Sequence, residues 1–434
     1  MFLRTIWTWG FLAVVAVAQE TPIYYDYVEN GTLKGGRAIV DRSNPEHRRI
    51  FGLDPDNVAA VVVHPFTTIR NNGPSANRID IVLLGDGYTA GELNAYAAHA
   101  ENVNSSFFAQ EPFAAYATYF NVHRVDVTSA ESGVDEINLN IFRNTALDMA
   151  YGCFGIDRLL CINIFKAHQA AASAPEYEQI LALANSTRYG GAGYPADEVG
   201  TLAGNNGSAV EIALHEFGHS FADLADEYDY GDGATYSGPE LIESNVSIFT
   251  EAQQIALSTK WHYWMDLANV GAFQGAAYNQ FGVYRPTFNS KMRALSRPFE
   301  QINIEQFVLF MYTIVTPIDD ATPASPTPLS QLTTLYVVPL APNDHGLSVQ
   351  WAVDGSDVIG ATGTTFRLAD QTPAPGVYTV SVTVRDMTTR VRDENARAAL
   401  MVASRQWQVE VPGCQNVEAA QAEPAQIEVD IITD

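Results

Sequence analysis

The segment EIALHEFGHSFADLADEYDYGDG, residues 211–233, constrains the fold more than any other part of the chain. His215 and His219 lie four residues apart, so a helix would place them on one face, and each could direct a ring nitrogen to one ion about 2 Å away. Glu216 lies beside that face, where it could act as general base and acid on a zinc-bound water without being a ligand. The pattern therefore predicts a helix that carries a catalytic metal.

The rest of this helix is apolar. Ala213, Leu214, Phe217, Phe221 and Leu224 provide a face for burial in a core. Histidines of an ordinary core could also occupy such a helix. However, two imidazoles and a carboxylate in apolar surroundings all need partners, and one metal ion satisfies them together. A catalytic zinc takes three protein ligands and keeps a fourth position open, so one ligand is still missing.

The third ligand is expected in the acidic stretch after the helix, where Asp223, Asp226, Glu227 and Asp229 are available. A straight helix would carry Asp226 about 10 Å beyond His219, too far to share an ion. The chain must therefore turn sharply after His219. We rank Glu227 first and Asp226 second as the third ligand, and we expect the other carboxylates to face solvent.

Charge and the N-terminus restrict the partners and the compartment. The chain of 434 residues has a formal net charge of −26, with 24 basic against 50 acidic side chains, which excludes nucleic acid as a partner. Residues 1–18 combine Arg4, an apolar run and a small-x-small ending, which is typical of a signal peptide. An uncleaved anchor is the alternative, but the run is shorter than the ~20 residues that span a bilayer. We expect a secreted or exported protein, periplasmic or extracellular, without a membrane span after signal removal.

Hydrophobic patterning predicts an α+β fold with several regions. Strands are expected at residues 79–84, 119–129 and 158–165, and a helix over EYEQILALANS, residues 176–186. The prolines of ATPASPTP mark a linker, and the alternating strands after it are typical of an immunoglobulin-like β-sandwich. The predicted regions are a signal peptide (1–18), a short β-rich N-terminal lead (19–76), a catalytic domain (77–320), a Pro-rich linker (321–328), the β-sandwich (329–413) and an acidic disordered tail (414–434).

Two cysteines lie near each other in CFGIDRLLC. Cys153 and Cys161 are close enough in sequence to form a local disulfide after export. The sequence leaves open whether they are bridged.

Four motifs in the same order resemble the IgA-peptidase family of bacterial secreted zinc metallopeptidases. They are IVLLGDGYTAGEL, TRYGGAGYP, HEFGHSFADLADEY and YRPTFNSKMRAL, between Asn77 and Phe310. The resemblance implies a metzincin-like zinc peptidase domain, in which a mixed sheet supports the HExxH helix and one catalytic Zn²⁺ is bound. It also implies a methionine turn, with Met292 as the hydrophobic base under the histidines; ordinary core filling is the alternative.

The sequence departs from the metzincin pattern at two positions. Metzincins often carry a tyrosine two residues after the methionine that can bind the substrate carbonyl, and here that residue is Ala294. Tyr284 is the nearest substitute. Metzincins also usually place a third His or Asp at a fixed spacing after a glycine, whereas this chain has Ala225 at the His position.

The glycines of RYGGAGYP are candidate substrate contacts. Gly190, Gly191 and Gly193 would let the backbone approach an extended peptide laid antiparallel across the zinc. A plain loop turn is the alternative.

The leading functional hypothesis is a secreted zinc-dependent endopeptidase that hydrolyses peptide bonds of extracellular proteins, with a protein or glycoprotein substrate. One alternative is a catalytically inactive metal-binding or adhesive surface protein. The presence of Glu216 between the two histidines argues against this alternative, because an inactive protein would not need a catalytic base. The other alternative is a zinc hydrolase of glycopeptides.

Overall fold

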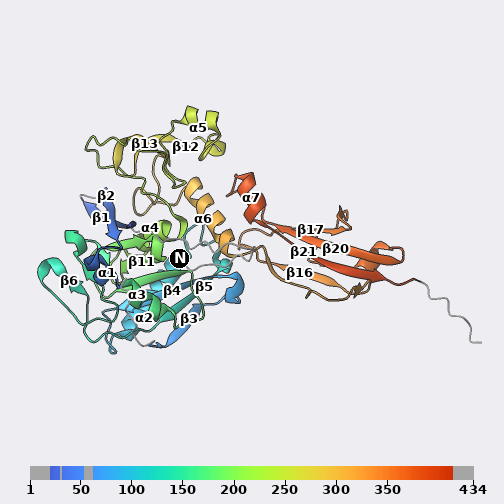
Figure 1. The fold of residues 1–434 in the computed structure, drawn as a ribbon, viewed down its shortest axis with the longest axis horizontal. Coiled ribbons are helices and arrows are strands. Elements are labelled where there is room, and N and C mark those ends of the chain that lie inside the picture. Colours follow the sequence, from blue (N-terminus) through green and yellow to red (C-terminus); the bar gives the residue numbers. More distant parts are fainter. Residues whose placement is uncertain (1–19, 30–31, 53–61, 414–434) are drawn as a thin grey trace, which may run out of the picture. The chain divides into compact units, whose positions relative to one another are not determined.

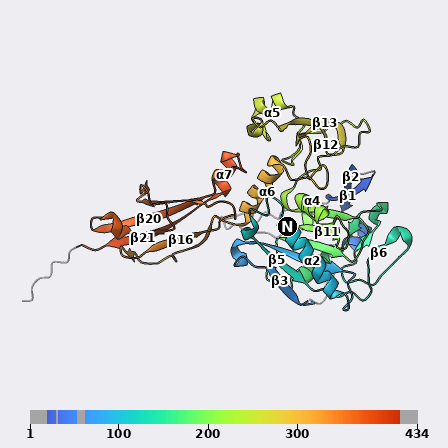
Figure 2. The ribbon, with the colours of Figure 1, turned by 180° about the vertical axis from the view of Figure 1, so that it is seen from behind.

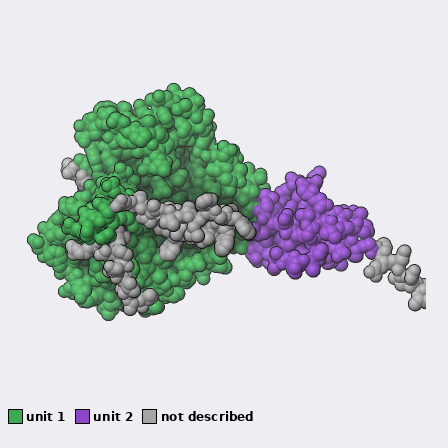
Figure 3. All heavy atoms as spheres, in the orientation of Figure 1, with its two compact units in different colours: residues 1–319, 339–348, 385–403 green, residues 320–338, 349–384, 404–434 purple. Residues whose placement is uncertain are grey.

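The computed structural model describes residues 20–29, 32–52 and 62–413, which form two compact units (Figure 3). The predicted signal peptide (1–18) and acidic tail (414–434) lie outside the described residues. The first unit comprises the chain up to residue 319 together with 339–348 and 385–403, and the second contains the rest. Among the helices of the described residues, none has the length and apolarity required to cross a membrane.

An eight-stranded mixed sheet forms the centre of the first unit (Figure 1). Its strands follow the order β2 (Thr32–Asp41), β1 (Glu20–Glu29), β10 (Gly191–Tyr194), β11 (Val199–Ala203), β9 (Gln179–Ala184), β4 (Ile79–Asp86), β5 (Phe120–Val125) and β3 (Phe66–Arg70). The central strands β11, β9, β4 and β5 are parallel, and the strands outside them pair antiparallel. Strands β1, β2 and β3 come from the predicted N-terminal lead, so that lead contributes both edges of the sheet.

Strand β9 takes the place of the helix predicted over residues 176–186, so that prediction was wrong. All of Gln179–Ala184 is buried, and the strand pairs in parallel with β4 on one side and β11 on the other. A strand covered on both faces has a continuous apolar run instead of an alternating one. Periodicity cannot distinguish such a short run from a buried helix.

Helices cover both faces of the sheet. Strand β4 shows why, because Ile81 and Leu83 face one core while Val82 and Leu84 face the other. The first core contains α2 (Leu93–Phe107), α4 (Ala209–Ala222) and α6 (Gln301–Ile314), and the second contains residues of α1 (Pro45–Phe51) and α3 (Ile164–Ala171). Helix α3 begins inside the strand predicted at 158–165, where Asn163 caps it by accepting from the Lys166 N–H.

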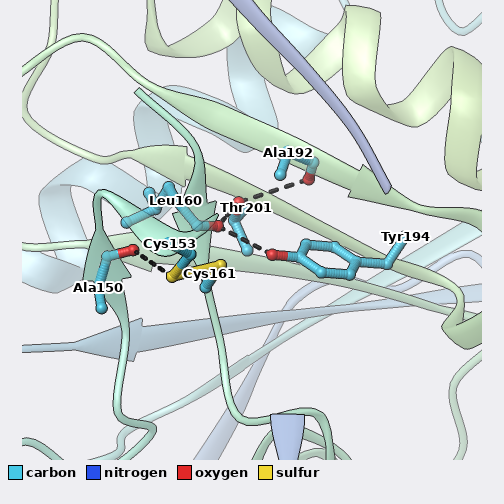
Figure 4. Close-up of a disulfide and its surroundings, with 7 residues drawn as sticks. All are labelled: Ala150, Cys153, Leu160, Cys161, Ala192, Tyr194 and Thr201. Carbon is cyan, nitrogen blue, oxygen red and sulfur yellow. Dashed lines mark hydrogen bonds between the residues drawn. A yellow bond between two sulfur atoms is a disulfide. The ribbon is translucent and has the colours of Figure 1, made fainter. Parts of the chain in front are cut away.

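A disulfide joins Cys153 to Cys161 next to the sheet (Figure 4). Cys161 lies in a small sheet of β6 (Asp135–Glu136), β7 (Ala150–Tyr151) and β8 (Leu160–Cys161). The hydroxyls of Thr201 and Tyr194 both donate to the carbonyl of Leu160, at 2.8 and 3.1 Å. The disulfide-bonded loop is thereby attached to β10 and β11.

The first unit also contains the hairpin of β12 (Val270–Ala276) and β13 (Asn279–Thr287), with α5 (Glu251–Leu257) before it and α7 (Glu394–Leu400) near the C-terminus. The second unit is built on two sheets. One contains β14 (Ile318–Ala321), β16 (Leu335–Pro339) and β19 (Thr365–Phe366); the other contains β15 (Leu329–Ser330), β21 (Val402–Val411), β20 (Gly376–Arg385), β17 (Ser348–Val353) and β18 (Ser356–Asp357).

Trp351 lies in the core of the second unit, where its ring stacks on Phe366 and Trp407 with ring centroids 5.3 and 5.8 Å apart. Two segments of the predicted β-sandwich, residues 339–348 and 385–403, belong to the first unit instead. The immunoglobulin-like assignment stays a prediction.

Candidate metal centre

Helix α4 buries both histidines of the motif. Phe217 packs edge-on against Phe107 of α2 at 5.0 Å between ring centroids, and it stacks on Phe307 of α6. This packing covers most of the helix, and all residues from Ile212 to Ala222, including His215 and His219, are buried. Their separation of four residues places them on the same side of α4.

A left-handed residue ends α4 and turns the chain back toward the histidines. Asp223 has φ 50° and ψ 37°, and the N–H of Leu224 closes the turn by donating to the carbonyl of Gly218 at 3.0 Å. Aspartate tolerates this conformation because its short polar side chain can bond locally, so no glycine is required here. The side-chain amide of Asn245 then accepts from the N–H of Ala225 and donates to its carbonyl, both at 2.8 Å. The turn returns Asp226 to the imidazoles.

Three potential ligand atoms converge after this turn. Nε2 of His215 lies 3.1 Å from Nε2 of His219. Oδ1 of Asp226 lies 3.1 Å from the first nitrogen and 3.3 Å from the second. Ligands that bind a tetrahedral ion at about 2 Å are about 3.3 Å apart, so the three atoms have the spacing of ligands around one ion.

The other ring nitrogens determine the tautomers of both histidines. Nδ1 of His219 lies 2.6 Å from the carbonyl oxygen of Leu224, and Nδ1 of His215 lies 3.0 Å from that of Lys291. A carbonyl only accepts, so each Nδ1 carries the proton and each Nε2 of a neutral ring presents a lone pair. Two lone pairs and a carboxylate oxygen repel one another at these distances unless a positive charge lies between them. The donor set therefore fits a divalent metal ion.

The surroundings of Asp226 favour its ionised form. Burial raises the pKa of this carboxyl, but positive charge on the imidazoles of His219 and His215, as in their protonated forms, outweighs burial and holds the pKa well below the usual value. The second oxygen, Oδ2, accepts a hydrogen bond of 2.5 Å from the hydroxyl of Tyr278. The N–H of Tyr278 donates to the carbonyl of Tyr228 at 3.0 Å, which fixes the phenol beside the carboxylate. Asp226 is thus held in one orientation.

Glu227, ranked first as third ligand from the sequence, points away from the histidines. Its Oε1 accepts from the amides of Asn245 and Asn303 at 3.0 and 2.8 Å, and its Oε2 accepts from the hydroxyl of Ser290 at 2.6 Å. The geometry therefore corrects the ranking, because Asp226 is the carboxylate that contacts both imidazoles. Adjacent side chains point in different directions along a chain. Of the neighbours Asp226 and Glu227, only one carboxylate can therefore face the histidines.

Tyr278, and not Tyr284, carries the hydroxyl that contacts this centre. Tyr284 lies farther along β13, where its backbone pairs with Ser247. Tyr278 sits in the tight turn between β12 and β13, where Ala277 and Tyr278 have φ values of 46° and 68°. The sequence favoured Tyr284 over Tyr278 because Tyr284 is the tyrosine nearest to Met292 along the chain. The two alternating segments on either side of residues 277–278 were a signal for such a hairpin.

Met292 packs against α4. A Cβ placed on Gly218 would lie only 2.7 Å from the sulfur of Met292, so the thioether rests directly on the helix at Gly218. The backbone also links this segment to the turn after α4, since the carbonyl of Met292 accepts from the N–H of Glu227 at 2.8 Å. The methionine-turn role that the resemblance implies for Met292 stays a prediction.

Strand β10 crosses α4 at Glu216. A Cβ on Gly193 would lie 3.0 Å from Oε2 of Glu216 and 3.1 Å from Cβ of His219, and one on Gly191 would lie 3.5 Å from Oε1 of Glu216. A larger residue at Gly193 would press on the carboxylate, so the glycine allows the strand and the helix to approach each other. Substrate contacts by these glycines, and by Gly190 just before them, stay a prediction.

A protein-family model described as IgA Peptidase M64 matches residues 67–269. The match includes the central strands, α4, the turn after it and Asp226, and it ends just before β12. A comparison with curated proteins gave no match. The three candidate ligands and Glu216 thus lie in the part of the chain that matches a peptidase family. Residues 67–269 match the IgA peptidase M64 family.

Proposed function

We propose that this peptidase is a secreted, zinc-dependent endopeptidase that hydrolyses peptide bonds of extracellular proteins. The observation that carries the proposal is the convergence of two imidazole nitrogens and one carboxylate oxygen next to a buried glutamate. Nitrogen and oxygen ligands in this number are typical of catalytic zinc. The Cys153–Cys161 disulfide and the signal-peptide pattern of residues 1–18 support export, because disulfides persist in oxidising compartments.

Each polar residue of the centre has a role in this proposal. His215, His219 and Asp226 would hold the Zn²⁺, which supplies Lewis acidity to the scissile carbonyl and the attacking water when bound. Glu216 accepts the proton of the attacking water on a carboxylate oxygen and returns it to the leaving amide nitrogen. Tyr278 keeps Asp226 oriented by donating to its second oxygen.

Metal analysis tests the proposal directly. The purified full chain is expected to bind about one zinc per chain, because the three ligand atoms surround a single position. Hydrolysis of a panel of protein substrates should stop in the presence of a chelator and return on addition of zinc. A chain with His215→Ala serves as the metal-free comparison. Failure to take up zinc, or hydrolysis that a chelator does not affect, would contradict the proposal.

Tyr278→Phe is expected to keep the fold and lower zinc affinity. The variant loses a hydrogen bond to a charged group, which is worth about 1.5–3 kcal/mol, or roughly tenfold to a hundredfold in zinc affinity if the bond is fully lost. Zinc titration against a competing chelator measures this loss. Tyr284→Phe is the comparison variant. A larger loss in Tyr284→Phe than in Tyr278→Phe would return the role to Tyr284.

A further inference from the structure

The ligand and base side chains of the candidate centre are almost completely buried. His215, Glu216 and His219 are 0% exposed, and Asp226 is 1% exposed. A polypeptide substrate has to bring a carbonyl carbon to these groups, and no peptide can do so while they are covered. The elements that cover them therefore determine how a substrate enters.

Strand β1 covers the centre from the edge of the sheet. It pairs antiparallel with β10, with Tyr24 opposite Gly193, the glycine that lies over the carboxylate of Glu216. The ring of Tyr24 stacks on that of His219, with centroids 4.3 Å apart and an angle of 10° between the planes. Tyr24 itself is only 7% exposed. Figures 1 and 2 both show β1 and β2 beside α4.

We propose that β1 occupies the place of the substrate: the enzyme accepts an extended peptide segment that adds to β10 and sets an aromatic side chain on His219, and β1 has to leave this edge first. This inference rests on the proposed peptidase function and deepens it. A bound β1 makes the chain latent, and its sequence indicates which substrates fit. Strand addition gives affinity through main-chain hydrogen bonds, while side-chain pockets give selectivity.

The β1–β2 hairpin can move without losing its own hydrogen bonds. Strand β1 pairs with β2 along its full length, from Glu20 opposite Asp41 to Glu29 opposite Thr32. Among the described residues, the hairpin is held to the rest of the unit by its pairing with β10, by Ile23 and Val40 in the core and by Arg42, just beyond β2, which donates to both carboxylate oxygens of Asp197. Departure of the hairpin would expose β10 as an edge strand, which is a template for another strand.

A cavity beside Tyr24 gives a substrate room next to the centre. It has a volume of about 420 Å³ and reaches from Tyr24 to Asp226. Tyr230, Tyr236 and Tyr278 contribute aromatic surface to its walls. Aromatic side chains pack well against such walls, which agrees with the stacking of Tyr24 on His219.

The test uses the full chain loaded with zinc and carrying Tyr24→Ala. Tyr24→Phe keeps the ring, and Ile39→Ala, at a residue 44% exposed on β2, is the matched control in the same hairpin. Three quantities are measured on each preparation: the rate at which zinc passes to an excess of chelator, the initial rate of peptide hydrolysis, and binding of a synthetic peptide of residues 20–26. Thermal midpoints check that each variant is folded.

Tyr24→Ala is expected to release zinc and to hydrolyse peptides roughly twofold to tenfold faster than the parent, since an aromatic pair is worth about 0.5–1.5 kcal/mol beyond its buried area. It should also bind the peptide of residues 20–26 and cleave peptides with an aromatic residue in preference to matched alanine peptides. A peptide in which Tyr24 is replaced by alanine should bind more weakly. Tyr24→Phe should stay close to the parent, as should Ile39→Ala.

Two results would overturn the inference. If Tyr24→Ala releases zinc faster but hydrolyses more slowly, Tyr24 is a fixed wall of the active site. If release and peptide binding do not change in any variant, β1 does not control access. Faster release and specific binding of the peptide, without hydrolysis by any variant, would support β1 as the occupant of the strand site and refute the proposed peptidase function alone.

Discussion

Glu216→Gln is expected to abolish hydrolysis while the fold and the zinc remain. Glutamine has nearly the same shape as glutamate, so the buried site under Gly193 stays filled. It cannot accept the proton of the attacking water, and loss of a positioned proton-transfer group costs about 10²–10⁴-fold in rate. Zinc content, thermal midpoint and hydrolysis rate should be measured on one preparation.

Glu211→Gln is the matched control on the same helix. Glu211 pairs with Lys291 at 2.5 Å, and the side chain of Lys291 is 1% exposed. Glu211→Gln removes the negative charge and leaves the buried ammonium of Lys291 without its partner. The thermal midpoint should therefore fall, while turnover per folded molecule is retained. Glu216→Gln should show the opposite pattern. Activity of Glu216→Gln within a few-fold of the parent would mean that Glu216 is not the base.

The sequence predicted the helix that carries His215 and His219 better than the strands around it. The spacing of His215 and His219 depends only on helix geometry, so it could be interpreted without knowing the rest of the fold. Strand β9 could not be identified in this way, because its apolar run has the same composition as a buried helix. Only its pairing with β4 and β11 distinguishes the strand from a helix. The glycines of β10 were expected to let the backbone approach an extended peptide, with a plain loop turn as the alternative; in the structure Gly193 also lets the strand pack closely on α4.

The ligand order and the covering strand depend on tertiary contacts that no local pattern reveals. Asp226 reaches the histidines because Asp223 adopts a left-handed conformation and Asn245 holds the turn from 20 residues away. Tyr24 and His219 lie far apart in the sequence, and the pairing of β1 with β10 brings their rings together. Periodicity and spacing describe neighbours within an element, so they carry no information on either contact.

Asp226→Asn and Glu227→Gln are expected to have opposite effects, although the residues are adjacent. Asp226→Asn keeps the shape of the side chain but removes the one carboxylate among the described residues that contacts both imidazoles. Zinc affinity should fall by more than the ~10–100-fold that loss of an outer-shell partner costs. Glu227→Gln should retain zinc, since the carboxylate of Glu227 is directed to Ser290, Asn245 and Asn303.

The stability of the Glu227→Gln variant provides a second measurement. The glutamine oxygen can still accept from Asn245 and Asn303, and its amide can donate to the hydroxyl of Ser290, so the cost should be about 1 kcal/mol. Burial raises the pKa of Glu227 above its usual 4.5, although the donors around it oppose this, so the folded state holds the proton more tightly than the unfolded state. The parent therefore loses stability as pH rises from 4.5 through the raised pKa.

Glu227→Gln lacks this titration, and its stability relative to the parent should improve as pH rises through the same window. Denaturant unfolding of both chains at a series of pH values measures the difference. Zinc titrations of Asp226→Asn and Glu227→Gln complete the comparison. Equal loss of zinc in the two variants would show that the turn after α4 serves the centre as a unit, and it would remove the distinction between ligand and support on which the assignment of Asp226 depends.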